Sequence, residues 1–259
     1  MNLHRTNTRI IARLDIKGPN LIKGVRLEGL RVVGDPNSFA ENYYKAGADE
    51  LIYMDSVASL YGRNHLGKLI ESATRNIFIP ITVGGGIRSV EDARDILRSG
   101  ADKVAINTAA VRNPDLIKKL AENFGSQSIV VSIEAKKVDE HSWEVYIEGG
   151  RERTGIDVND WVKFCQSEGA GELLVTSIDN EGTRRGFEVD LYKTISKNTI
   201  IPIIASGGFG KVEHALRVVE AGGVDAIAIA DAVHYNRVSF GEVRDYCREA
   251  KLNVRNFDK

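Results

Sequence analysis

The sequence predicts an α/β fold in which eight parallel strands close into a single (β/α)8 barrel, and three observations predict it. Short apolar runs of strand length alternate with polar segments of helical periodicity along the 259 residues. The runs are nearly all apolar, which is typical of parallel strands covered on both faces. The two halves of the chain also resemble each other, so each half would supply four strand-helix units of one barrel.

The predicted elements alternate throughout the chain. The strand candidates, in order, are residues 9–15, 50–55, 79–85, 103–107, 128–134, 172–179, 200–206 and 225–230. Helical periodicity predicts helices between them, which include residues 37–47, 89–100, 114–125 and 211–223. Several of these stretches end in glycine, which commonly terminates helices because it adopts the left-handed conformation.

An internal repeat divides the chain. Residues 79–110 align with 201–233 after a one-residue gap, 47–55 align with 169–177, and 9–17 align with 128–136. The competing fold, a doubly wound open sheet, is disfavoured by this repeat and because no GxGxxG follows the first strand. We therefore expect one domain over residues 1–259, with half-repeats at about 1–125 and 126–259.

Composition excludes several classes of partner. The chain carries 35 Lys+Arg against 36 Asp+Glu, a net charge of −1, so nucleic acid and anionic membranes are not expected partners. The first residues lack the apolar segment of a signal peptide, and no run of about 18 uncharged apolar residues predicts a membrane span. Two cysteines, Cys165 and Cys247, fit a reduced cytoplasm. The histidines lack metal-ligand spacing, so no metal or cofactor is predicted.

Two carboxylates end equivalent strands. Asp15 closes the first strand candidate and Glu134 the fifth, and the repeat makes them partners across one mouth of the barrel. Strand ends and the loops after them form the active face of such barrels, so the pair is predicted to act as general acid and general base. The competing interpretation, two capping or surface carboxylates, is weakened by their matched positions.

Glycine-rich turns follow the third and seventh strands, at residues 84–86 and 207–208. Backbone without side chains lets N–H groups approach an anion, so two such turns suggest an elongated substrate with an anion at each end. Asn107 and Thr108 add polar donors beside the first turn. The second half has Asp231 at the equivalent place, and a fixed carboxylate there argues against a phosphate dianion. The residues leave three interpretations open: Asp231 is protonated, it is turned away from the substrate, or it selects a hydroxyl, an amine or a sugar group.

Charged residues begin four of the strands. Arg9, Glu50, Lys103 and Glu172 start the first, second, fourth and sixth strand candidates. Two cations and two anions in these places would form a ring at the bottom of the barrel. Such a ring either solvates the closed end or acts as a gate into the interior, and the residues alone leave both interpretations open.

Taken together, the motifs resemble one family over almost the whole chain. The segments are RIIARLDIK, NLIKGVRLEGLRVVGDP, DELIYMD, IPITVGGGI, GADKVAINTAAV, GSQSIVVSIEAK, RERTG, GAGELLVTSID, IPIIASGG and NVR. They are similar to the cyclase subunit HisF of imidazole glycerol phosphate synthase, in order and in spacing. The resemblance implies a half-repeat barrel that takes ammonia from a glutaminase (HisH-like) subunit docked on its bottom. With it the family cleaves a bis-phosphorylated ribulosyl intermediate into imidazole glycerol phosphate and an aminoimidazole carboxamide ribotide.

The resemblance also assigns roles to residues. It makes Asp15 and Glu134 the catalytic pair, Arg9, Glu50, Lys103 and Glu172 an ammonia gate, and Asp102 a residue that faces the glutaminase. The implied substrate-binding residues are Lys23, Gly85, Gly86, Asn107, Thr108, Thr176, Glu181, Gly182, Ser206, Gly207, Gly208 and Asp231.

Departures from the family cluster at the upper mouth. Glu134 and Glu181 stand where the family has aspartates, Asp231 stands where it has a phosphate-binding serine, and Arg13 replaces a small residue. The main prediction is a HisF-type cyclase supplied with ammonia by a glutaminase. The alternatives are a paralogue whose altered pocket serves amidation or amidination of a surface-glycan sugar, and a non-catalytic conduit that activates the glutaminase.

Overall fold

The computed structural model describes residues 7–56 and 66–257, and within them the predicted barrel is present. Its parallel strands are β1 (Arg9–Lys17), β4 (Glu50–Asp55), β5 (Ile81–Gly84), β6 (Lys103–Ile106), β7 (Ile129–Lys137), β10 (Glu172–Ser177), β11 (Ile203–Ser206) and β12 (Ala226–Ile229). Each pairs with the next, and pairing of Arg9 in β1 with Ala226 in β12 closes the cylinder. All eight strand candidates are confirmed.

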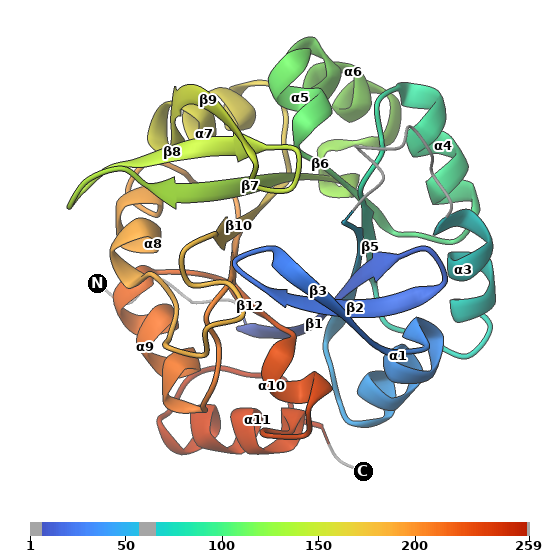
Figure 1. Cartoon of the computed structure of the whole chain (residues 1–259), viewed down its shortest axis with the longest axis vertical. Helices are drawn as coiled ribbons and strands as arrows, with labels where there is room; N and C mark the ends of the chain where they lie inside the picture. Colours follow the sequence, from blue (N-terminus) through green and yellow to red (C-terminus); the bar gives the residue numbers. More distant parts are fainter. Residues whose placement is uncertain (1–6, 57–65, 258–259) are drawn as a thin grey trace.

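Helices surround the barrel (Figure 1). They are α1 (Pro36–Lys45), α3 (Leu66–Ala73), α4 (Val90–Arg98), α5 (Thr108–Arg112), α6 (Asp115–Phe124), α7 (Val158–Ser167), α8 (Val189–Ile195), α9 (Glu213–Gly222), α10 (Asp231–His234) and α11 (Phe240–Glu249), with a 3-10 turn η1 (Ser126–Ser128). Local sequence sets their ends: Ser89 and Ser239 form capping boxes at α4 and α11, and Gly223, with φ of 72°, ends α9 in the left-handed conformation.

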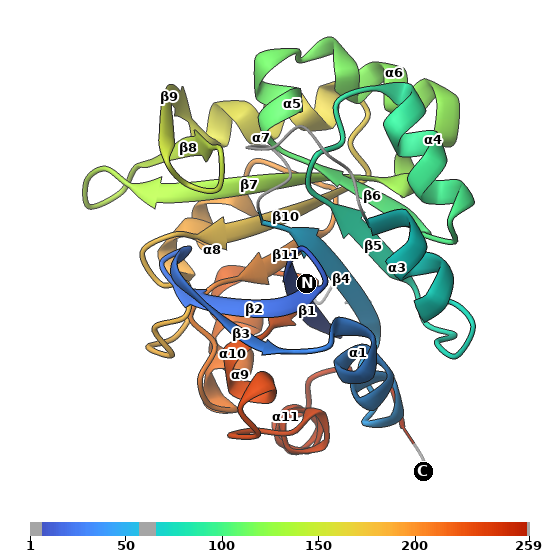
Figure 2. The ribbon, with the colours of Figure 1, turned by 45° about the vertical axis from the view of Figure 1, so that its right-hand side comes forward.

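Two antiparallel hairpins extend equivalent strands. β2 (Asn20–Val25) and β3 (Glu28–Gly34) continue β1, whereas β8 (Trp143–Ile147) and β9 (Glu152–Asp157) continue β7. Both project from the end of the barrel at which β1 and β7 finish (Figure 2). The hairpins are not predicted from the sequence, because β3 and β9 are largely exposed and carry no buried apolar run.

Alternation along the strands separates an outer core from an inner one. On β1, Ile10, Ala12 and Leu14 pack outward in the larger core under the helices. Ile11 points inward and packs with Ile52, Ala105, Val130, Leu174, Ile204, Ala226 and Ala228 in a second, apolar cluster. Since side chains alternate along a strand, Arg9, Ile11, Arg13 and Asp15 share the inner face of β1. This strand therefore carries charged groups at both ends of an apolar interior.

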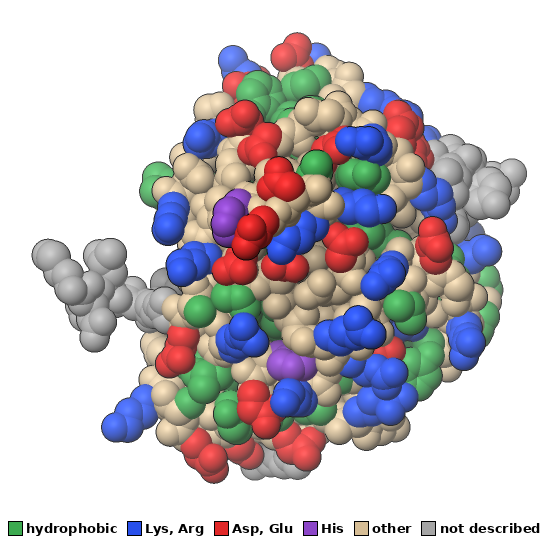
Figure 3. Space-filling view, turned by 60° about the vertical axis from the view of Figure 1, so that its left-hand side comes forward, with side chains coloured by type: hydrophobic (Ala, Val, Ile, Leu, Met, Phe, Trp, Pro, Cys, Tyr) green, Lys and Arg blue, Asp and Glu red, His purple; other side chains and the backbone are tan. Residues whose placement is uncertain are grey.

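One face of the outer surface mixes charges of both signs. On the face shown in Figure 3, acidic and basic side chains are interspersed and hydrophobic ones are scattered. Within residues 7–56 and 66–257, no helix combines the length and the apolar character needed to cross a membrane.

Candidate active site and basal ring

A cavity of about 310 Å³ lies at the mouth of the barrel. It is formed by the carboxyl ends of the strands and the loops that follow them, the usual position of an active site in this fold. Eight of the predicted site residues line it: Asp15, Lys23, Gly85, Gly86, Asn107, Thr108, Glu134 and Glu181. The other predicted substrate-binding residues are not among its lining: Thr176, Gly182, Ser206, Gly207, Gly208 and Asp231.

Asp15 lies in a buried network of charges. Its Oδ1 accepts a hydrogen bond from Arg13 Nε at 2.9 Å, and its Oδ2 accepts one from Lys23 Nζ at 3.2 Å. Lys23 also pairs with Glu181. Burial alone would raise the pKa of Asp15, but the two cations outweigh it and hold this pKa well below its usual range. Asp15 is therefore a carboxylate at neutral pH.

Glu134, its counterpart in the repeat, has a different environment. Its Oε2 accepts a hydrogen bond from the Gly150 N–H at 2.8 Å. Burial raises the pKa of Glu134 to about 7, against the opposing effects of that hydrogen bond and of Arg13 and Arg151. A carboxyl that titrates near neutral pH is suited to both accept and donate protons. The two strand-end carboxylates thus differ in protonation although the repeat makes them equivalent.

The first glycine turn opens onto the cavity. Gly85 has φ of 96°, and a Cβ on it would come within 2.3 Å of the Asp55 carbonyl oxygen, so only glycine fits. Thr108 Oγ1 accepts a hydrogen bond from Glu148 N at 3.0 Å, and Asn107 Oδ1 is buried without a partner among the described residues. Backbone, hydroxyl and amide groups therefore meet at one end of the cavity.

The second glycine turn is covered. A Cβ on Gly208 would lie 2.0 Å from the carbonyl oxygen of Gly186, and Gly186 N donates a hydrogen bond to the Gly208 oxygen at 2.8 Å. Asp231 is ion-paired with Arg184 at 3.5 Å. The loop between β10 and α8 thus lies over this turn, and the two halves of the site differ.

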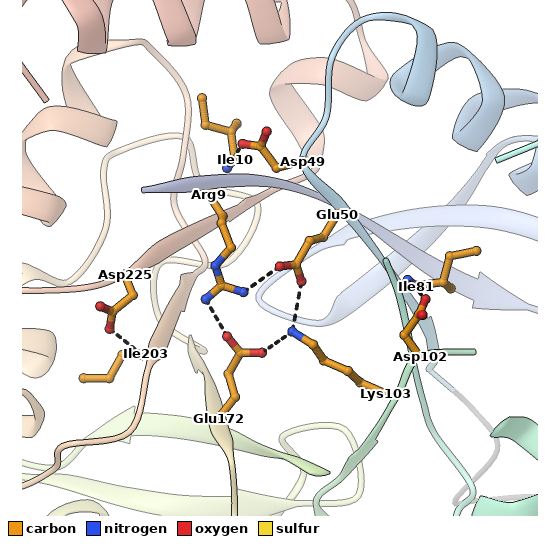
Figure 4. A network of polar contacts seen from close by, with 10 residues as sticks. All are labelled: Arg9, Ile10, Asp49, Glu50, Ile81, Asp102, Lys103, Glu172, Ile203 and Asp225. Atoms are coloured by element: carbon orange, nitrogen blue, oxygen red, sulfur yellow. Dashed lines mark hydrogen bonds and ion pairs between the residues drawn. The ribbon is translucent and has the colours of Figure 1, made fainter. Parts of the chain in front are cut away.

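The four strand-start residues form a closed ring at the opposite end of the barrel (Figure 4). Glu50 pairs with Arg9 at 2.7 Å and with Lys103 at 3.2 Å. Glu172 pairs with the same two cations, at 2.5 and 2.8 Å. Each carboxylate bridges both cations, so the ring has no net charge and encircles the axis.

Comparison with known proteins identifies the family. The profile of the family described as histidine biosynthesis protein matches residues 9–239. An imidazole glycerol phosphate synthase subunit HisF from Legionella pneumophila is 64% identical over 208 residues, 80% of this chain and 98% of that protein. The same subunit from Bacillus cereus (strain Q1) is 48% identical over 247 residues, 95% of this chain and 98% of that protein. The chain belongs to the HisF family.

This membership confirms the resemblance found in the sequence and the expected class, a synthase subunit of histidine biosynthesis. The compared relatives carry the HisF name, and nothing in the comparison supports the paralogue or conduit alternatives. The roles of individual residues stay predictions.

Asp102, the predicted partner contact of this HisF-family chain, also has a place in the fold. It is exposed near the ring, and its Oδ2 accepts a hydrogen bond from Ile81 N at 2.8 Å. Asp49 and Asp225 make the same bond to Ile10 and Ile203, at 2.7 and 3.0 Å (Figure 4). These aspartates fasten the start of one strand to the start of a neighbouring strand, a structural role that leaves Asp102 exposed to a partner.

Several residues of the cavity were not predicted. Arg112, Glu148 and Arg151 line it, and Arg112 pairs with Glu148 at 3.0 Å. Glu148 and Arg151 belong to the turn of the β8–β9 hairpin. Because this hairpin is not predicted from the sequence, these two residues are not predicted either. Among the histidines, His4 and His65 lie outside the described residues, and His234 is buried against Tyr43 as a packing residue.

Proposed function

We propose that this chain, as the HisF subunit of an imidazole glycerol phosphate synthase, takes ammonia from a glutaminase (HisH-like) subunit docked below the ring. The ammonia then crosses the barrel and reacts with a phosphorylated ribulosyl substrate in the mouth cavity. One observation carries the proposal: β1 bears Arg9 of the ring and Asp15 of the cavity on the same inner face, with Ile11 between them. The two sites are therefore the ends of one interior.

The interior favours a neutral nitrogen species. Between ring and cavity most of the inward side chains are apolar, and they include Ile52, Val130, Leu174 and Ile204, while Thr82, the register partner of Ile52, adds one buried hydroxyl. Moving an ion into such surroundings costs far more than moving a small neutral molecule, because the ion loses its hydration. Ammonia is therefore expected to cross the barrel as NH3, and ammonium to be excluded.

The mouth supplies the groups that the reaction needs. The first glycine turn, with Asn107 and Thr108, would hold a phosphate end of the substrate. Asp15, as a carboxylate, would stabilise positive charge that develops at the reacting centre. Glu134 would move protons as the new bond to nitrogen forms.

We further propose a cytoplasmic heterodimer. A net charge of −1 and the mixed charges on the face shown in Figure 3 support a small-molecule enzyme over one that binds nucleic acid or membranes. The buried, unpaired Cys165 and Cys247 suit a reducing compartment.

Rescue of a histidine auxotroph that lacks its own cyclase tests the assigned reaction. Expression of this chain with its glutaminase partner should restore growth without histidine. Failure of the wild type would contradict the proposal. If the double variant Glu134→Asp, Asp231→Ser then restored growth, the altered residues at the mouth would be the cause of the failure, and a different substrate for the wild type would be supported.

The ring is tested by the source of ammonia. Arg9→Ala leaves Glu50 and Glu172 with Lys103 as their shared cation, so the closed ring opens. Glutamine-dependent turnover is expected to fall about tenfold or more, equivalent to about 1.4 kcal/mol, while turnover with added ammonium salt stays near wild type. The matched control is Arg98→Ala, an exposed arginine in the last turn of α4. Equal losses with both nitrogen sources would contradict the gate.

A further inference from the structure

Arg13 is a buried arginine at the centre of the barrel mouth. It is 5% exposed and lies on the inner face of β1, one inward position above Ile11 and one below Asp15. A charged side chain in such a place requires partners that satisfy both its charge and its N–H groups.

The guanidinium spans the barrel. Its Nε donates to Asp15 Oδ1 at 2.9 Å, and its Nη1 donates to Thr176 Oγ1 at 2.8 Å and Ser206 Oγ at 3.1 Å. These partners belong to β1, β10 and β11, so contacts from three strands fix the orientation of Arg13. Thr176 and Ser206, which the resemblance predicts to bind substrate, hold this arginine in the structure.

Asp15 therefore has a cation on each oxygen. Arg13 occupies Oδ1 and Lys23 occupies Oδ2, and Glu181 balances the second cation. The group has two positive and two negative charges, so a proton on Asp15 would leave an unbalanced buried cation. Of the other titratable groups that face Asp15, His234 adds no charge near neutral pH, since burial lowers its pKa to about 3.

Glu134 is held by one backbone donor. Gly150 N–H occupies Oε2, and the groups facing the carboxyl from other elements are Arg13, Arg151 and the Asn107 amide. Since Glu134 also lines the cavity, a proton can reach it from a bound substrate.

We propose that Arg13 is a positioning residue that keeps Asp15 permanently ionised and so assigns proton transfer at the mouth to Glu134 alone. The proposal rests on the function proposed above. Glu134 takes one proton from the ammonia nitrogen as that nitrogen bonds to a substrate carbon. As the bond between that carbon and the departing group breaks, its electron pair leaves with the group, and Glu134 gives the proton to this group, which returns the side chain to its starting state. Asp15 exchanges no proton and stabilises positive charge beside it.

NMR titration of side-chain carboxyl ¹³C in the free protein tests the division without any substrate. Between about pH 4 and about pH 9, the Asp15 signal should stay that of a carboxylate. Glu134 should titrate with a midpoint near 7. Titration of Asp15 above about pH 5, or complete ionisation of Glu134 below about pH 5, would overturn the proposal.

Variants at Arg13 test whether this residue keeps Asp15 ionised. Arg13→Met removes the charge and keeps a long side chain, and it should bring the Asp15 midpoint above about pH 4. Arg13→Lys should keep Asp15 ionised, as conservative rescue. Arg244→Met, at a buried arginine remote from the mouth, controls for general destabilisation and should leave both titrations unchanged. If Arg13→Met leaves the titration midpoint of Asp15 unchanged, Arg13 does not keep Asp15 ionised. If Arg13→Met does not fold, the titrations of the wild type and of Arg13→Lys test the proposal.

The titration and the auxotroph rescue fail separately. If the chain shows these titrations but does not restore growth, the division of roles between Asp15 and Glu134 is supported and the proposed reaction is contradicted. If growth is restored but Asp15 titrates near neutral pH, the reaction is supported and the division of roles is contradicted.

Discussion

Replacing Glu134 with glutamine is expected to lower turnover with free ammonia by about 10²- to 10⁴-fold, the usual contribution of a general acid or base. Glutamine has the same length, and its amide oxygen can still accept the Gly150 N–H that Glu134 accepts at 2.8 Å. The substitution therefore preserves the shape of the cavity and removes only the ability to exchange a proton. The loss should appear in kcat, with KM nearly unchanged.

In the wild type, turnover and stability should both change with pH as Glu134 gains or loses its proton. As pH rises through about 7, Glu134 loses its proton, so a step in which it acts as base accelerates and one in which it acts as acid slows. Stability should follow too, because the pKa rises from 4.5 to about 7 on folding. Between these values the folded chain binds the extra proton, so the contribution of Glu134 to stability falls as pH rises.

Both pH dependences should be absent in Glu134→Gln. Glu140→Gln, an exposed glutamate between β7 and β8, is the matched control and should behave like the wild type. Turnover of Glu134→Gln within about threefold of wild type would remove Glu134 from the chemistry, since general acid–base catalysis contributes far more than that.

The strands and the ring are predictable because they follow from local patterns. Alternation of apolar runs and helical segments fixes the order of the barrel strands, and the repeat pairs positions across it. Arg9, Glu50, Lys103 and Glu172 all start strands, and the starts of parallel barrel strands meet at one end. Their meeting in a ring therefore follows from topology, whereas the distances between them need coordinates.

The asymmetry of the mouth is not predictable in this way. Alternation places Arg13 inside the barrel, but its bonds to Thr176 and Ser206 join residues more than 160 positions apart. The second glycine turn is covered by the approach of Gly186 to Gly208, and Arg184 in the same loop adopts φ of 61°. Both features depend on the conformation of the loop between β10 and α8, which has no hydrophobic periodicity. The two glycine turns are therefore equivalent in the sequence repeat but differ in the structure.

Removing the carboxylate of Asp49 is expected to cost about 3–5 kcal/mol of unfolding free energy, the range for breaking one side of a buried ion pair. Asp49 Oδ2 accepts a hydrogen bond from Ile10 N at 2.7 Å, and Oδ1 pairs with Arg244 at 3.0 Å and Arg255 at 2.9 Å. Arg244 is 3% exposed, so in Asp49→Ala its guanidinium remains buried without its carboxylate partner.

Asp225→Ala is the matched control for this loss. Asp225 makes the same bond to Ile203 N at 3.0 Å but has no buried arginine beside it among the described residues, so about 1 kcal/mol is expected. Urea unfolding of both variants measures the difference. Equal losses would show that the strand-start hydrogen bond carries the whole effect. If the uncompensated charge carries it, Asp49→Ala combined with Arg244→Met should be more stable than Asp49→Ala alone, because the second substitution removes the unpaired cation.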